Sequence, residues 1–153
     1  IRYPKGASEL PYIAPTRVVL GKGEIARNGK GVAIISIGNM LGMALKTAEL
    51  LSKKGIECAV INARFIKPLD ETLLSETFAR ANRIVTLEEG VLEGGFGSSV
   101  LEFIERAGIK DIKVRRIGLP DKFIEHGRRS ELFLKYNLTP DAICDVIINE
   151  VVK

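Results

Sequence analysis

The residues best suited to chemistry lie in one glycine-rich segment, EEGVLEGGFGSS, at residues 88–99. Glu88 and Glu89 follow an apolar run, and a glycine loop then leads to a helix that a serine would cap. The backbone N–H groups of such a loop can meet a ligand, with either glutamate as acid or base. Paired surface glutamates are common, however, which favours close packing of the loop against another protein surface. On that interpretation the interface or channel candidates are Glu88, Glu89, Gly94, Gly95, Phe96 and Gly97.

Two further segments also follow expected strands. In residues 36–40, SIGNM, a glycine turn precedes a helix and could hold an anion. The spacing lacks the GxGxxG fingerprint, so a plain tight turn is favoured. Residues 118–127, GLPDKFIEHG, contain the single histidine, His126, a further interface or channel candidate. No serine or cysteine nucleophile has a sequence context that pairs with it. We therefore assign no catalytic residue and no metal ligand within the chain.

Alternating strands and helices must position these segments. The apolar patterns predict strands at residues 24–27, 32–37, 57–61, 83–87 and 112–117. They predict helices at residues 40–54, after Pro68 and Asp70, at 98–107, and from the Thr139-Pro140-Asp141 cap to about residue 152. Residues 8–15 contain two prolines and no periodicity, which is typical of a linker.

The order of these elements predicts an α/β fold with three layers, α/β/α, around a mixed sheet of about five strands. Strands that alternate with helices run parallel and are joined by right-handed crossovers. The Asn28-Gly29 turn between the first two strands indicates a hairpin, so the first strand should be antiparallel. The wholly apolar run VAIISI should be a central strand, and the alternating last strand should lie near an edge.

Composition excludes several classes of function. The chain has 153 residues, the size of one domain, and a net charge of +4. Its basic residues are scattered pairs rather than a stripe, which argues against nucleic-acid binding. No apolar run approaches the roughly 18 residues needed to span a membrane. Cys58 and Cys144 lie in apolar segments, as expected for buried free thiols in a reducing compartment.

Six segments in order resemble one family: IRYPKG, GKGE, VAIISIGNM, NARFIKPLD, VTLEEGVLEGGFGSSV and GLPDKFIEHG. Together they resemble the C-terminal domain of the 1-deoxy-D-xylulose-5-phosphate synthase family, in the transketolase superfamily. The likeness covers essentially the whole chain. NARFIKPLD and GLPDKFIEHG point to this synthase family in particular, whereas EEG…GGFGS alone would also fit 2-oxo acid dehydrogenase beta subunits.

The resemblance implies a bacterial, cytoplasmic transferase that condenses pyruvate with glyceraldehyde 3-phosphate and releases CO₂. Such enzymes use thiamine diphosphate and Mg²⁺ and supply isoprenoid, thiamine and pyridoxal precursors. They have three α/β domains and work as homodimers, and the third domain supports the dimer and borders the substrate channel. By the same resemblance, Arg2 of IRYPKG would bind the phosphate of the sugar substrate, unless it is an ordinary linker arginine paired with an acid.

The family's diphosphate- and magnesium-binding motif, GDG with a downstream Asn, does not occur in the sequence. Neither does the segment with the cofactor-activating glutamate, a role that Glu88 and Glu89 do not inherit. We therefore expect residues 1–15 to be a linker from a missing middle domain and residues 16–153 to be a C-terminal domain. Alone it should be inactive and bind no cofactor. The alternatives are a separately encoded half of a split transketolase or beta-type subunit, and a stand-alone anion-binding module.

Overall fold

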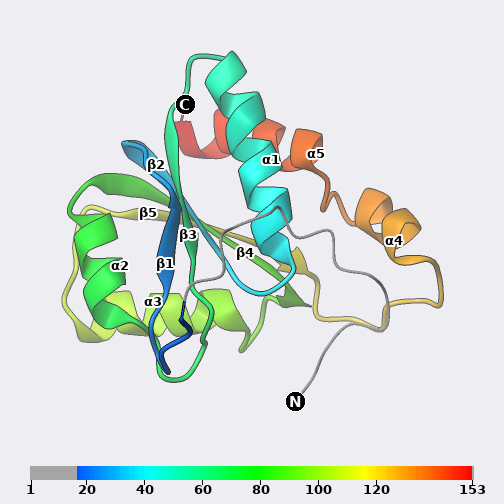
Figure 1. The fold of residues 1–153 in the computed structure, drawn as a ribbon. Helices are drawn as coiled ribbons and strands as arrows, with labels where there is room; N and C mark the ends of the chain where they lie inside the picture. The colour runs from blue at the N-terminus through cyan, green and yellow to red at the C-terminus, as the bar shows by residue number, and fades with distance from the viewer. Residues whose placement is uncertain (1–16, 153) are drawn as a thin grey trace.

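A mixed five-stranded sheet with helices on both faces forms the body of the domain (Figure 1). The computed structural model describes residues 17–152, so the expected linker over residues 1–15 and Arg2 lie outside the described residues. The strands are β1 (Glu24–Arg27), β2 (Gly31–Ser36), β3 (Cys58–Asn62), β4 (Ala81–Val91) and β5 (Lys113–Leu119). The helices are α1 (Met40–Lys53), α2 (Glu71–Phe78), α3 (Phe96–Arg106), α4 (Arg129–Lys135), α5 (Pro140–Val146) and the π-helix η1 (Ile147–Val152).

The strand order is β1-β3-β2-β4-β5, with β2 to β5 mutually parallel and β1 antiparallel to its neighbour β3. The α/β class, the five strands, the antiparallel first strand and the central position of β2 are therefore confirmed. The expected β1–β2 hairpin is wrong, because β3 lies between the two strands. The chain crosses the start of β3 at Gly29, where a Cβ atom would lie 2.1 Å from the carbonyl carbon of Cys58.

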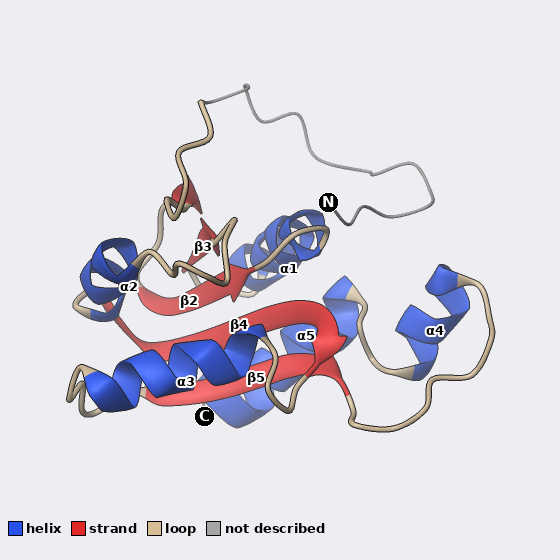
Figure 2. Ribbon diagram, turned by 90° about the horizontal axis from the view of Figure 1, so that it is seen from below, coloured by secondary structure: helices blue, strands red, loops and turns tan. Residues whose placement is uncertain are grey.

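Apolar side chains of β2 alternate between the two faces of the sheet, which gives the domain two cores. Val32 and Ile34 face α1, α5 and η1, whereas Ala33 and Ile35 face α2 and α3. Figure 2 shows α3 on one side of the sheet and α5 on the other, so the three-layer arrangement is confirmed. Both faces of β2 are covered, which explains why its sequence has no polar side.

Local signals fix the helix ends where the sequence indicated them. The Asp70 carboxylate accepts from Leu73 N at 3.2 Å at the start of α2, and Thr139 Oγ1 accepts from Ala142 N at 3.3 Å at the start of α5. Gly55 follows α1 with a φ of 78°, a left-handed conformation that glycine adopts without strain. The Asp70 and Thr139 caps satisfy N–H groups that a helix start leaves unpaired.

Both cysteines are buried free thiols, as expected. Desolvation raises the pKa of Cys58 to about 11, so this thiol is protonated at neutral pH. Among the described residues, none of the helices has the length and apolar character needed to cross a membrane.

Candidate functional site

The ends of the parallel strands and the start of β1 share one edge of the sheet, here called the carboxyl edge. Asn62 ends β3 beside Ser36 at the end of β2, and Ser36 in turn pairs with Leu87 of β4. Because β1 runs the opposite way, its first residue, Glu24, lies beside Asn62. Ligands of open α/β sheets collect at this edge, and all three candidate segments of the sequence include the end of a strand there.

Strand β4 is longer than the sequence predicted, which changes the setting of the two glutamates. It continues to Val91, which pairs with Leu119 of β5 after a shift in register. Glu88 and Glu89 therefore lie within the strand rather than after it. Successive side chains of a strand point to opposite faces of the sheet, so the two carboxylates contact helices on opposite faces.

Glu88 is buried, with only 3% of its surface exposed, and its carboxylate caps helix α3. Oε2 accepts from Phe96 N and Oε1 from Gly97 N, each at 2.8 Å. The interpretation of Glu88 as one of two surface glutamates is wrong. The expected serine cap is also wrong, because α3 begins at Phe96, two residues before Ser98.

The surrounding glycines make room for this carboxylate. A Cβ atom on Gly95 would lie 2.3 Å from Glu88 Oε2, and one on Gly90 would lie 2.9 Å from it. A Cβ atom on Gly118 would approach Glu88 Cγ to 3.0 Å. We call Glu88 with Gly90, Gly95 and Gly118 the Glu88 cradle. The cradle closes the N-terminus of α3 to an external anion, because the carboxylate already occupies the N–H groups there.

Phe96 is fully buried in the core between the sheet and the α2–α3 layer. Its ring is therefore not available to contact another protein surface, and the expectation of Phe96 as an interface residue is corrected. Gly97 also has a packing role, because a Cβ atom there would lie 2.6 Å from Thr86 Oγ1. An interface role for the exposed Gly94 and its neighbours stays a prediction.

Arg116 holds the glycine loop from the adjacent strand, a role that the sequence analysis missed. Its Nη1 donates to the Leu92 carbonyl at 2.7 Å and to Ser98 Oγ at 2.9 Å. Ser98 Oγ in turn donates to the same carbonyl at 2.9 Å. The signal in the sequence was the break in alternation at Arg115-Arg116, where two arginines follow one another in the strand. Arg115 is exposed, whereas Arg116 is partly buried.

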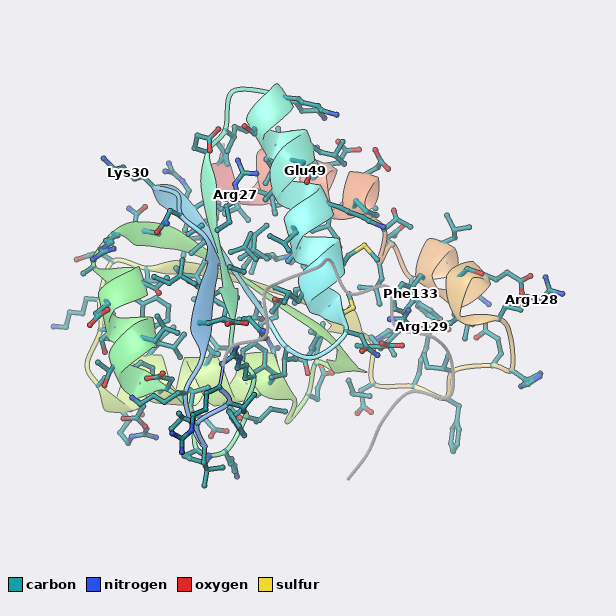
Figure 3. All side chains as sticks on the ribbon, in the orientation of Figure 1. Arg27, Lys30, Glu49, Arg128, Arg129 and Phe133 are labelled. Atoms are coloured by element: carbon teal, nitrogen blue, oxygen red, sulfur yellow. The ribbon has the colours of Figure 1, made fainter. Side chains whose placement is uncertain are left out.

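Glu89, on the opposite face of β4, joins the strand to helix α4 through a two-point ion pair. Its oxygens accept from Arg129 Nε at 2.7 Å and Nη2 at 2.8 Å. The Arg129 guanidinium also lies over the Phe133 ring, 4.3 Å from its centroid (Figure 3). We call these three residues the Glu89 latch. Helix α4 itself was not predicted, because arginine is not a residue that signals a helix start; Glu131 Oε2 accepts from Arg128 N at 3.3 Å there.

His126 lies exposed in the loop between β5 and α4, outside the Glu88 cradle. The structure therefore brings Glu88 together with the glycine loop but does not bring His126 to it. Within the described residues, no group of three or more His, Cys, Asp or Glu side chains could hold a metal ion.

The NARFIKPLD segment fixes the point at which the chain enters the domain. Glu24 forms an ion pair with Arg64 and accepts from Asn62 Nδ2 at 2.9 Å. Asp70 accepts from Gly23 N at 3.1 Å and forms an ion pair with Lys22 at 3.2 Å. Burial alone would raise the pKa of Asp70, but the hydrogen bonds it accepts and the Lys22 ammonium keep that pKa below its ordinary value. The chain thus enters at the carboxyl edge.

Comparisons with known proteins agree with this architecture. The transketolase C-terminal domain family matches residues 21–143. The chain is 46% identical over 145 residues to the 1-deoxy-D-xylulose-5-phosphate synthase of Desulforudis audaxviator, which covers 94% of this chain and 23% of the relative. It is 44% identical over 148 residues to the synthase of Halothermothrix orenii, covering 95% and 23%. The chain thus spans about a quarter of the length of these curated relatives.

Solved structures give the same picture. A split-gene transketolase, described as an inactive beta4 tetramer, superimposes with a TM-score of 0.84 at 30% identity and covers 94% of this chain and 47% of that one. The transketolase of Campylobacter jejuni superimposes with a TM-score of 0.62 at 14% identity, over 85% of this chain and 19% of that one, which shows a shared fold. The chain therefore belongs to the transketolase C-terminal domain family, and it matches the C-terminal domain of 1-deoxy-D-xylulose-5-phosphate synthases in particular.

Proposed function

We propose that this chain is the C-terminal domain of a thiamine diphosphate-dependent 1-deoxy-D-xylulose-5-phosphate synthase. The intact enzyme would condense pyruvate with glyceraldehyde 3-phosphate and release CO₂. The observation that carries this proposal is the 46% identity that extends over 94% of the chain to a protein of that name. The domain's part in the reaction would be to support the homodimer and to border the substrate channel, because its carboxyl edge carries the loops and receives the incoming chain.

The test is an assay of the full-length protein with pyruvate and glyceraldehyde 3-phosphate. We expect release of CO₂ that depends on thiamine diphosphate, Mg²⁺ and both substrates. The 153-residue chain alone should release none. Activity with a sugar phosphate donor in place of pyruvate, and none with pyruvate, would show a transketolase instead.

Thiamine diphosphate and Mg²⁺ do not fit the described residues. The N-terminus of α3, where backbone N–H groups follow a glycine loop, is filled by the Glu88 carboxylate, which would repel a diphosphate. The cofactor would therefore sit in the parts of the longer protein that precede this domain. Calorimetric titration of this chain with the cofactor and Mg²⁺ should show no binding near the low-micromolar range, about −8 kcal/mol.

Arg2 is our candidate for the phosphate of glyceraldehyde 3-phosphate. A guanidinium matches a phosphate with two parallel hydrogen bonds, each charge-assisted. Such a contact is worth roughly 1.5–3 kcal/mol, so Arg2→Ala in the full-length enzyme should raise the KM for the phosphorylated aldehyde about tenfold or more. The KM for pyruvate should barely change. Equal effects on both substrates, or none, would mean that Arg2 is a structural linker residue.

A second candidate is that this chain is a separately encoded half that works only with a partner chain. The 0.84 TM-score with a split-gene transketolase favours it. The intact mass of the protein purified from its source separates the two. A mass near 16.8 kDa or about twice that value supports a split form, and a mass about four times larger supports the single-chain synthase.

A further inference from the structure

Residues 120–136, here called the arm, form a unit that stands away from the three layers. The arm consists of the loop after β5, helix α4 and Tyr136. Figure 2 shows α4 beyond the carboxyl ends of β4 and β5, apart from α2 and α3. The arm therefore extends the carboxyl edge outward instead of covering either face of the sheet.

Packing of Phe133 and Tyr136 against the core and an ion pair attach the arm to the body of the domain. Phe133 reaches the core beside α1 and α5 and is only 8% exposed. The Glu89 latch adds the ion pair to Arg129. Leu138, fully buried, then returns the chain to the core before α5. The position of the arm is thus defined, although most of its surface faces solvent.

Contacts within the arm make it an ordered surface. Glu125 accepts from the Tyr136 hydroxyl at 2.8 Å and forms an ion pair with Lys135. The Lys122 ammonium lies over the Tyr136 ring, 5.1 Å from its centroid. A segment that is held by internal non-covalent contacts and is fixed relative to the body of the domain loses little conformational freedom on binding. This favours association.

The arm also presents apolar side chains to solvent. Phe123 is completely exposed, at 104%, and Leu134 is 68% exposed. Aromatic side chains are enriched at protein interfaces and supply much of their binding energy. An ordered arm with a fully exposed phenylalanine therefore has the features of a docking surface.

We infer that the arm docks on the domains of the longer protein that precede this 153-residue chain, with Phe123 as its apolar anchor. This inference rests on the proposed function, in which the chain is one domain of a longer protein. The chain enters at the carboxyl edge, where Glu24 lies beside Asn62, and the arm leaves from the same edge after Leu119. The relatives are about four times longer than this chain, so the preceding residues are ample to cover that edge.

A second copy of this domain fits the arm less well. Stable interfaces between proteins bury at least about 1,000 Å². The arm of an isolated domain offers two exposed apolar side chains, Phe123 and Leu134, which fall short of such an area. A preceding domain tethered in the same chain needs less area, because the link raises its effective concentration.

The test is the labelling rate by a maleimide of Asp121→Cys, an exposed position of the arm that leaves Phe123 in place, measured in the full-length protein and in this 153-residue chain. The native thiols Cys58 and Cys144 are buried, so they add little background. We expect labelling to be about tenfold slower or more in the full-length protein, because the reaction needs an accessible thiolate. The matched control is Lys30→Cys, exposed at the opposite end of the sheet, whose labelling rate should be equal in the two proteins (Figure 3).

Equal rates for Asp121→Cys in the two proteins would overturn the inference. So would labelling of the isolated chain that slows as its concentration rises, because a second copy would then cover the arm. Amide hydrogen exchange of residues 120–136 in the unsubstituted proteins gives an independent measurement, and protection should appear only at full length. Protection of the arm in a protein without synthase activity would contradict the proposed function and leave this inference standing.

Discussion

Glu88 and Glu89 are neighbours on β4, yet they hold different parts of the molecule by different means. Glu88 is buried and accepts two backbone N–H bonds, so it joins α3 to the sheet inside the core. Glu89 is about one-third exposed and pairs with an arginine that is half exposed, so it joins α4 to the sheet at the surface. Glu88 therefore stabilises the core of the domain, whereas Glu89 holds the peripheral helix α4 in place.

The difference follows from the solvent around each carboxylate. Removing an acceptor from a buried donor leaves that donor with neither protein nor water as a partner. Removing one side of an exposed ion pair leaves a charge that water solvates, and such pairs are typically worth 0–1 kcal/mol. We therefore expect mutations in the Glu88 cradle to affect global stability, and mutations in the Glu89 latch to affect mainly the arm.

The largest effect should come from Glu88→Ala, which leaves the N–H groups of Phe96 and Gly97 without an acceptor. The free energy of unfolding should fall by about 3 kcal/mol, measured by urea denaturation. Formate or acetate should restore part of it, because a small carboxylate can occupy the vacated cradle. Glu88→Gln keeps the shape but turns an NH₂ group toward an N–H, so an intermediate loss is expected. If Glu89→Ala cost as much as Glu88→Ala, the comparison would fail.

A second effect concerns the space around the carboxylate. Gly95→Ala should destabilise the domain by about 2 kcal/mol, because its Cβ would lie 2.2 Å from the Val91 carbonyl oxygen and 2.3 Å from Glu88 Oε2. The matched control is Gly94→Ala, which has open space but a φ of 68°. A left-handed alanine costs about 1 kcal/mol, so Gly94→Ala should be the milder change. If Gly94→Ala lowered the Tm more than Gly95→Ala, backbone strain in the loop would matter more than the space around Glu88.

The Glu89 latch should give a smaller global effect with a local readout. A double-mutant cycle of Glu89→Ala and Arg129→Ala should give a coupling energy below about 1 kcal/mol, and the coupling should shrink as salt is added. Amide exchange in α4 should nevertheless accelerate in either variant, while that in α3 stays unchanged. Acceleration in both helices would mean that the latch is part of the global core.

The smallest effect should be a pH dependence confined to the arm. The hydrogen bond with Lys135, supported by the Tyr136 hydroxyl, lowers the pKa of Glu125 from 4.5 to about 2. Because the folded pKa lies below the unfolded one, this stabilisation is present above pH 4.5 and is lost as the pH falls toward 2. Amide exchange in residues 120–136 at pH 3, corrected for its intrinsic rate, should therefore be less protected than at pH 6. Glu125→Gln should remove the difference.

The sequence by itself determined the elements whose signals are local. Helix caps at Asp70 and Thr139, the left-handed Gly55 and the continuous apolar run of β2 each depend on a few neighbouring residues, and each was found where expected. The central position of β2 followed from its two apolar faces. These features could be predicted because the caps and strand periodicity reflect hydrogen bonding and side-chain direction within a few residues of the chain.

The tertiary structure alone decided which distant segments meet. The Asn28-Gly29 turn looked like a hairpin, but β3 takes the place beside β1, since partner choice depends on residues more than 30 positions away. Whether Glu88 is surface or core depended on the extra length of β4 and on where α3 begins. Phe96 was expected at an interface and lies in the core for the same reason. Sequence pattern records the chemistry of a side chain, whereas burial is a property of everything packed around it.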